Sequence, residues 1–442
     1  MINFLIGSFR FPEIQRCPCI MKSIRISDMI LFSSRLLFLC LTLNGALLCA
    51  EEISFLQVPQ VNPASMDGKV LCGYQGWFRC PDDGMHEGWH HWSRNRNRLT
   101  PASLTFEMWP DVSDLPESSQ FETPEFTDRS GKPLRLFSSA NAETVDIHFQ
   151  WMQTYGIDGV FLQRFLVNIE RPSFDVVLQN VRTSARKSGR VYAICYDLSG
   201  TPVDQIYNKL TTDWKRLVDE LEVTQDRQYQ HHNNQPVVFL WGLYPDRFDA
   251  EIANRLIDFF HEKTKYQATV AGGTPWYWRR EKDPGWFRAF RRLDILSPWN
   301  VGNVSHQDGN KEASTGYWQK DFEEATSNNV EWMPVIYPGF SWKNLKGESG
   351  ANATIPRRGG EFFWKQFLAA KKTGVKMAYV AMFDEVDEAT AIFKVSNHPP
   401  TQANFVTYEG LPADWYLRLT VAGVKVIRGE AEPVSEIPIH PE

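Results

Sequence analysis

Short apolar runs alternate with amphipathic stretches along the chain from Lys69 onward. Runs of about five residues rich in β-branched and aromatic side chains are typical of buried strands, and apolar residues spaced three and four apart are typical of helices. We predict strands over Val70–Tyr74, Leu104–Met108, Gly159–Gln163, Val191–Tyr196, Val237–Trp241, Ala268–Ala271, Ile295–Trp299, Trp332–Ile336 and Lys376–Met382. We predict helices over Phe174–Ser188, Asp204–Leu221, Asp249–Lys263, Tyr317–Ser327 and Gly360–Thr373.

This alternation predicts parallel strands joined by right-handed crossovers, which either close into a barrel or form an open sheet. The segment after the first predicted strand, Gly73–Phe78, has too few and wrongly spaced glycines for a dinucleotide-binding loop. That absence favours the barrel. We therefore expect an α/β fold of the (β/α)8 TIM type, a single domain with long βα loops. Because nine runs compete for eight places, one of them is not a barrel strand.

The beginning of the chain lies outside the alternating pattern. The apolar run Leu36–Leu48 follows basic residues and ends at Ala50, which is the pattern of an export signal. We expect cleavage near Ala50 and an exported protein, periplasmic or extracellular. The run is shorter than the roughly 20 residues of a membrane-spanning helix, and no later run is longer, so no stable membrane span is expected.

Four parts of the chain follow from these boundaries. Residues 1–50 comprise the signal peptide and upstream residues, 51–68 an N-terminal extension, 69–429 the barrel, and 430–442 a flexible tail rich in Pro and Glu. No internal repeat or low-complexity linker interrupts 69–429, which favours a single domain.

Aromatic residues and charge narrow the choice of partner. The chain has 442 residues, of which 16 are Trp and 13% are aromatic. Aromatic faces cover the C–H faces of sugars, so this content favours a carbohydrate partner. Residues 51–442 carry 42 basic and 51 acidic side chains, a net charge of −9, which disfavours nucleic acid. A monomer is favoured.

Cysteine and histidine residues give no metal-site signature. An exported protein permits a disulfide between Cys72 and Cys80, and two buried free thiols fit the sequence equally well. No Cys/His spacing matches a zinc site, and the adjacent side chains of His90 and His91 point in different directions from a helix or strand. We expect neither a metal nor an organic cofactor.

Polar and aromatic residues gather at the ends of the predicted strands, where the βα loops of a barrel build the active site. The candidate substrate-binding residues are Tyr74, Trp77, Arg164, Asp197, Trp241, Trp276, Tyr337, Arg357 and Asp384. Several have a structural alternative: Tyr74 and Trp77 also fit a core, Asp197 a helix cap, and Arg357 a salt bridge on the barrel rim. Trp276 either walls the cleft or packs. Either Gln163 or Arg164 faces the barrel mouth, depending on register.

Four carboxylates stand within five residues directly after the last predicted strand, Asp384, Glu385, Asp387 and Glu388. Residues three apart on a strand face opposite sides, so Glu385 and Glu388 share a cleft only where the chain turns. Mutual repulsion raises the pKa of at least one, which supplies a general acid and a general base. We take Glu385 and Glu388 as the candidate catalytic residues. A solvated acidic loop or a cation site is the alternative reading.

This loop resembles the Glu-x-x-Glu segment of glycoside hydrolase family 99 and related barrels. The other segments that carry the resemblance are Gly73–Phe78, Tyr155–Val160, Tyr337–Trp342 and Pro356–Gly360. In that family the paired glutamates cleave an α-mannoside bond with retention, within a glycan chain. The resemblance implies that Glu385 deprotonates the neighbouring 2-hydroxyl, and that Glu388 protonates the leaving oxygen and then activates water.

The loop also departs from that pattern. Asp384 stands where the family has Asn, Val386 where it has Trp, and Ala389 where it has Gly. The catalytic pair is kept, whereas the sugar specificity is open. We expect an endo-acting glycoside hydrolase of α-linked polysaccharide or glycan. The alternatives are a non-catalytic carbohydrate-binding protein on the same barrel, a xylosidase- or arabinosidase-type hydrolase, and a hydrolase that uses Asp384 or Asp387.

Overall fold

A computed structural model describes residues 60–442 of the chain. The expected signal peptide, its cleavage near Ala50 and the start of the N-terminal extension lie outside the described residues. The chain from Pro59 to Glu442 is one compact unit, in agreement with a single barrel domain.

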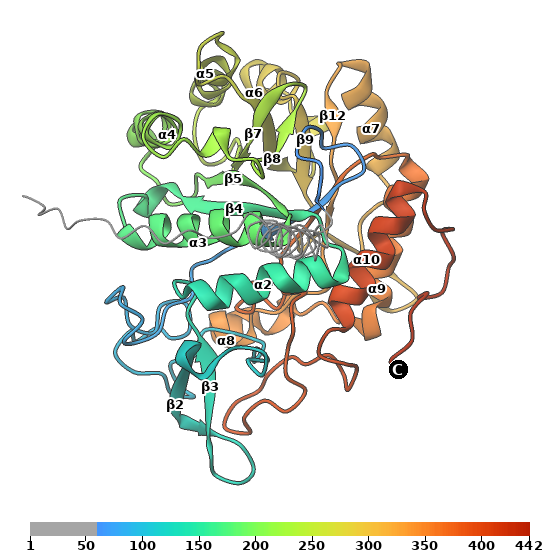
Figure 1. The fold of residues 1–442 in the computed structure, drawn as a ribbon. Coiled ribbons are helices and arrows are strands. Elements are labelled where there is room, and N and C mark those ends of the chain that lie inside the picture. The colour runs from blue at the N-terminus through green and yellow to red at the C-terminus, as the bar shows by residue number, and fades with distance from the viewer. Residues whose placement is uncertain (1–59) are drawn as a thin grey trace, which may run out of the picture. The chain divides into compact units, whose positions relative to one another are not determined.

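Parallel strands alternate with helices and form a barrel (Figure 1). The strands, in the order in which they pair, are β12 (Glu331–Trp332), β9 (Ile295–Trp299), β8 (Thr269–Pro275), β7 (Gln235–Trp241), β5 (Val191–Asp197), β4 (Gly159–Phe165), β1 (Val70–Tyr74), β14 (Ala378–Val380) and β13 (Val335–Ile336).

The two ends of this order meet in one stretch of chain, because only Met333 and Pro334 separate β12 from β13. The Met333 N–H donates to Leu296 of β9 over 2.9 Å, and the Tyr379 N–H of β14 donates to the Pro334 carbonyl over 2.9 Å. Since Pro334 has no N–H, it breaks the regular ladder at this point. The stretch 331–336 therefore closes an eight-membered (β/α)8 barrel, as expected.

The predicted strand Leu104–Met108 is the one that is not in the barrel. It lies in the long loop after β1, where the N–H groups of Glu107 and Met108 donate to the Val386 carbonyl. The alternation of buried apolar residues in this run reflects a loop packed on the barrel, and not a strand. The other eight runs coincide with barrel strands.

Helices cover the outside of the barrel (Figure 1). They are α2 (Ala142–Tyr155), α3 (Pro172–Ser188), α4 (Val203–Asp219), α5 (Ala250–His261), α6 (Pro284–Phe290), α7 (Trp318–Ser327), α8 (Lys343–Lys346), α9 (Glu361–Thr373) and α10 (Trp415–Arg428). The five predicted helices are confirmed, and α2, α6, α8 and α10 were not among them.

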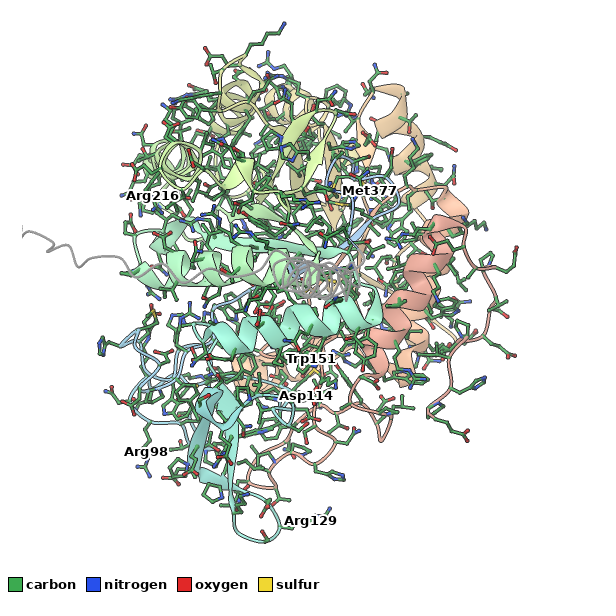
Figure 2. All side chains as sticks on the ribbon, in the orientation of Figure 1. Arg98, Asp114, Arg129, Trp151, Arg216 and Met377 are labelled. Carbon is green, nitrogen blue, oxygen red and sulfur yellow. The ribbon has the colours of Figure 1, made fainter. Side chains whose placement is uncertain are left out.

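Two hairpins extend the barrel, β2–β3 (Gln120–Thr127 with Pro133–Phe137) and β10–β11 (Val304–Gln307 with Asn310–Ala313). The loop before β2 is tied to α2, because the Trp151 indole N–H donates to Asp114 over 2.8 Å (Figure 2). Lys394 pairs with the same carboxylate. The tail 430–442 also makes contacts, since the Trp364 indole N–H donates to the Val434 carbonyl over 3.0 Å.

Cys72, Cys80 and Cys195 are buried free thiols, so of the two open readings the structure has unpaired cysteines. The Cys80 thiol instead donates to the Phe137 carbonyl. No helix among residues 60–442 is long and apolar enough to span a membrane.

Candidate active site

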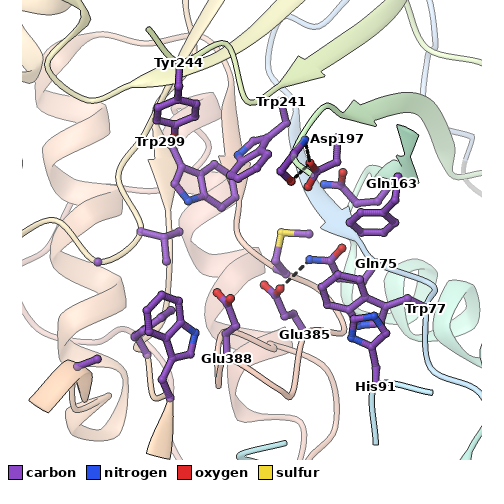
Figure 3. Close-up of a pocket in the computed structure, with 18 of the residues that line it drawn as sticks. Gln75, Trp77, His91, Gln163, Asp197, Trp241, Tyr244, Trp299, Glu385 and Glu388 are labelled. Carbon is purple, nitrogen blue, oxygen red and sulfur yellow. Dashed lines mark hydrogen bonds between the residues drawn. The ribbon is translucent and has the colours of Figure 1, made fainter. Parts of the chain in front are cut away.

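A cavity of about 940 Å³ opens at the carboxyl ends of the barrel strands. Figure 3 shows Trp241, Tyr244 and Trp299 on one wall, with Gln75 and Trp77 on the other. Glu385 and Glu388 lie between these walls. Aromatic walls around a few polar groups are typical of a site for a small-molecule ligand.

Glu385 is held in place by hydrogen bonds to both carboxylate oxygens. The Gln75 amide donates to Oε1 over 2.7 Å, and the Thr390 hydroxyl donates to Oε2 over 2.9 Å. The side chain is buried, and burial is the main reason that the pKa of Glu385 is raised well above its ordinary value. The neighbouring charge of Glu388 raises that pKa further.

Asp384 fixes the entry into this loop. Its two oxygens accept the N–H groups of Gln75 over 2.7 Å and Gly76 over 2.9 Å. The residue that presents its amide to Glu385 is thus anchored by the carboxylate next to Glu385 in sequence. Asp384 is fully buried, and burial raises its pKa to about 7.

Glu388 is more accessible than Glu385 and also lines the cavity. Burial raises its pKa to about 7, and the charge of Asp387 raises it further. Asp387 is itself buried with a pKa raised to about 8, mainly by burial. A group that titrates near neutral pH can both give and take a proton there, which a general acid and base must do.

Five of the predicted site residues line the cavity: Trp77, Asp197, Trp241, Glu385 and Glu388. Asp197, from the end of β5, accepts the Ser199 N–H over 2.7 Å, and burial raises its pKa. The Trp241 ring, from the end of β7, lies 4.8 Å from the Arg247 guanidinium carbon. Asp197 thus faces the cavity and also holds the start of its own βα loop.

Tyr74 and Arg164 point away from the cavity, because alternate residues of a strand face opposite sides. The Tyr74 hydroxyl meets His148 Nδ1 of α2 over 2.9 Å. Arg164 donates to both oxygens of Asp213 on α4, over 2.9 and 2.7 Å. Neither side chain lines the cavity in which the substrate-binding prediction placed it. Gln163 occupies the cavity side of β4 instead.

Trp276 and Tyr337 also lie away from the cavity wall. Trp276 packs against Tyr277 and Tyr317, with ring centroids 5.4 and 5.8 Å apart. Tyr337 packs against Phe362 of α9 at 5.0 Å. Tyr337 contacts the helical layer, whereas Trp276 packs against Tyr277 in its own loop and against Tyr317, the residue before α7.

Arg357 and Asp384 support the carboxylate loop and do not line the cavity. One nitrogen of Arg357 donates to the carbonyls of Ala389 over 2.8 Å and Ala391 over 2.6 Å. The guanidinium carbon lies 4.4 Å from the Tyr416 ring centre. Neither side chain lines the cavity, where contact with substrate was predicted, and both make hydrogen bonds that hold the carboxylate loop.

Sequence reasoning did not select the cavity residues Gln75, His91, Trp299 and Trp342, and it left the choice between Gln163 and Arg164 open. Gln163 and Trp299 stand near the ends of β4 and β9, and counting alternate residues inward from the strand cores would have chosen both. His91 comes from the long loop after β1, whose path no periodicity predicts. No group of three or more His, Cys, Asp or Glu side chains within residues 60–442 is arranged to hold a metal ion.

No protein-family model and no curated protein matches this chain. Solved structures share its fold. The GH99 endo-α-mannosidase from Bacteroides thetaiotaomicron is 14% identical, with 83% of this chain and 99% of that chain covered and a TM-score of 0.64. The same enzyme in complex with bis-tris propane gives 15% identity with the same coverage and TM-score.

The (β/α)8 barrel of this chain is therefore similar to that of the GH99 endo-α-mannosidase over nearly the whole length of that enzyme. The expected resemblance is confirmed at the level of the fold.

Proposed function

We propose that this protein is a glycoside hydrolase that cleaves α-linked bonds within a polysaccharide or glycan, with Glu385 and Glu388 as its catalytic carboxylates. The observation that supports this most directly is the pair of carboxyl groups with raised pKa at one aromatic-walled cavity. Glycoside cleavage requires two such groups. The fold similarity to an endo-α-mannosidase supports an α-mannoside-like substrate and endo action.

Glu385 suits the role of the base. Two hydrogen-bond donors, from Gln75 and Thr390, stabilise its ionised form and fix its orientation. In the proposed reaction, Glu385 removes the proton of the 2-hydroxyl of the sugar at the cleaved bond. That oxygen attacks the anomeric carbon and forms a 1,2-anhydro ring, while the bond to the leaving oxygen breaks.

Glu388 suits the role of the acid and then the base. Its more accessible carboxyl group, with a pKa near 7, donates a proton to the leaving oxygen and afterwards takes one from water. That water attacks the anomeric carbon, the 1,2-anhydro bond opens, and Glu385 returns its proton to the 2-oxygen. Two inversions at one carbon give overall retention.

The test is a hydrolysis screen of the purified protein against α-mannan, α-glucan, xylan and arabinan, beside Glu385→Gln and Glu388→Gln. Both variants keep the shape and hydrogen-bonding capacity of the side chain. We expect oligosaccharides from α-mannan, α configuration in the first-formed products by NMR, and loss of release in both variants. Polysaccharide binding without hydrolysis, unchanged in both variants, would identify a binding protein. Release from xylan or arabinan alone would overturn the α-mannoside assignment.

A further inference from the structure

His91 faces the candidate cavity from the loop after β1 in a constrained conformation. Its backbone has φ +62°, in the region that favours glycine, and its carbonyl accepts the Thr105 hydroxyl over 2.6 Å. Its ring stacks on Trp77, with centroids 3.8 Å apart and planes 10° from parallel. Figure 3 shows this stack on the wall that carries Gln75, beside Glu385. Such strain persists only where the surroundings hold it, and it gathers at functional sites.

The ring is also held by a carboxylate from the catalytic loop. His91 Nδ1 lies 3.1 Å from Oδ2 of Asp387, which stands between Glu385 and Glu388 in sequence. The Asp387 side chain is 4% exposed, whereas that of His91 is 29% exposed. A buried carboxylate that meets one ring nitrogen fixes the ring orientation and determines which nitrogen carries the proton.

His90 and His91 differ in how many of their ring nitrogens have a partner within the protein. His90 uses both nitrogens within the protein, since Nδ1 meets the Trp77 carbonyl at 3.1 Å and Nε2 meets Arg171 at 2.7 Å. His91, in contrast, has a partner for Nδ1, and its Nε2 has no hydrogen-bond partner among residues 60–442. Its accessible edge therefore has one hydrogen-bonding position left for a ligand.

We propose that His91 is a substrate-contacting residue whose Nε2 binds a sugar hydroxyl beside Glu385, and that Asp387 is the positioning residue that fixes the His91 ring and tautomer. The inference rests on the proposed function and adds a sugar contact to it. The stack on Trp77 holds the His91 ring in a fixed position, and Nε2 forms the hydrogen bond to the hydroxyl. Burial and nearby arginines lower the pKa of His91 to about 3, so the ring is neutral at physiological pH and suits an uncharged hydroxyl.

Two substitutions at His91 separate this role from simple packing. His91→Phe keeps the stack on Trp77 and removes the nitrogens, whereas His91→Gln loses the stack and keeps a hydrogen-bonding group at similar reach. Binding of an α-linked manno-oligosaccharide is measured by calorimetry in the Glu388→Gln background, which stops turnover. Melting curves identify any variant that fails to fold.

We expect His91→Phe to weaken binding about tenfold, the effect of one hydrogen bond of roughly 1.4 kcal/mol, and His91→Gln to weaken it less. Unchanged affinity in His91→Phe, or tighter binding by Phe than by Gln, would overturn the sugar contact. If the Glu388→Gln parent binds no manno-oligosaccharide, the same comparison is made with xylo- and arabino-oligosaccharides. Absence of all binding counts against the proposed function and the sugar contact together.

The positioning role of Asp387 can be tested without a ligand. Histidine ¹⁵N shifts distinguish the two neutral tautomers, and loss of a signal in His91→Phe assigns His91. We expect one tautomer in the native protein and a mixed or reversed state in Asp387→Asn. An unchanged His91 signal in Asp387→Asn would overturn the positioning role, whatever the hydrolysis screen shows.

Discussion

The raised pKa of Glu388 determines whether hydrolysis should rise or fall with pH. The general acid must be protonated, and the pKa of Glu388 is raised to about 7. We therefore expect hydrolysis to fall as pH rises through about 7. Initial rates between pH 4 and 9 measure this limb. Glu388→Gln should lose about 10²–10⁴-fold at every pH, whereas Glu430→Gln on the exposed tail keeps the native profile.

Gln75 controls the ionisation of the other glutamate. Gln75→Leu removes the donor to Oε1 of Glu385, and Thr390→Val removes the donor to Oε2. Loss of a donor disfavours the carboxylate, so its pKa rises further. We expect each variant to lower kcat by about tenfold and to move the acidic limb of the rate profile to higher pH. Lower kcat with an unmoved acidic limb would contradict the assignment of Glu385 as the base.

Some site residues could be predicted from the sequence, and others could not. Glu385 and Glu388 were chosen because they belong to a cluster of carboxylates directly after the last predicted strand, and both line the cavity. The choice between Gln163 and Arg164 depended on the strand register, which the sequence did not determine. Arg164 was selected, but its side chain pairs with Asp213 on the helical side of the sheet. A buried arginine requires a buried carboxylate, but the sequence does not show that this partner lies on α4.

At the scale of elements, the carboxylate loop depends on a single buried arginine. Arg357 reaches the Ala389 and Ala391 carbonyls and packs on Tyr408 and Tyr416. Arg357→Met keeps most of the volume, leaves the buried Ala389 carbonyl unpaired, and leaves the Ala391 carbonyl with the Tyr408 hydroxyl at 3.3 Å as its remaining side-chain partner. We expect the free energy of unfolding to fall by about 2–4 kcal/mol, together with a loss of hydrolysis.

Arg358 offers the matched control next to it. Its side chain pairs with Glu312 and donates to the Lys311 carbonyl outside the carboxylate loop, and it is 18% exposed, so Arg358→Met should cost less than Arg357→Met. Denaturant unfolding of both variants measures the difference. Equal losses in the two variants would show that Arg357 is an ordinary rim residue, which was the structural alternative expected from the sequence.

Strands and helices were predicted well where burial is periodic, and poorly where it is not. Eight of the nine runs coincide with barrel strands, because a strand buried on both faces is a continuous apolar run. Leu104–Met108 has the same pattern for another reason, since Phe106 and Met108 are buried within the long loop after β1. Helix α2 was missed because its polar residues, such as His148, are themselves buried against the sheet.

For the whole molecule, the site makes folding stability depend on pH. Burial raises the pKa of Asp384 to about 7, of Asp387 to about 8 and of Glu388 to about 7, and that of Glu385 also lies well above its ordinary value. The folded protein therefore holds protons that the unfolded chain has released. The free energy of unfolding then decreases as pH rises.

Buried histidines act in the opposite direction and limit the pH window. The pKa values of His90, His91 and His148 are lowered to about 3, so these groups add stability as pH rises toward 6.5. At pH 6.5 about half of the unfolded chain's histidines are already neutral, and their contribution becomes constant about one pH unit higher. The four carboxyl groups with raised pKa outweigh this remaining contribution, so stability should fall between pH 6.5 and 8.

Asp387→Asn isolates one of these carboxyl groups. The amide does not titrate, so the variant should lose less stability than the native protein between pH 6.5 and 8, by on the order of 1 kcal/mol. Glu432→Gln, on the exposed tail, should keep the native slope. Urea unfolding at three pH values measures each slope. Parallel slopes for the native protein and Asp387→Asn would mean that Asp387 is already ionised in the folded state well below pH 7, which would contradict the raised pKa.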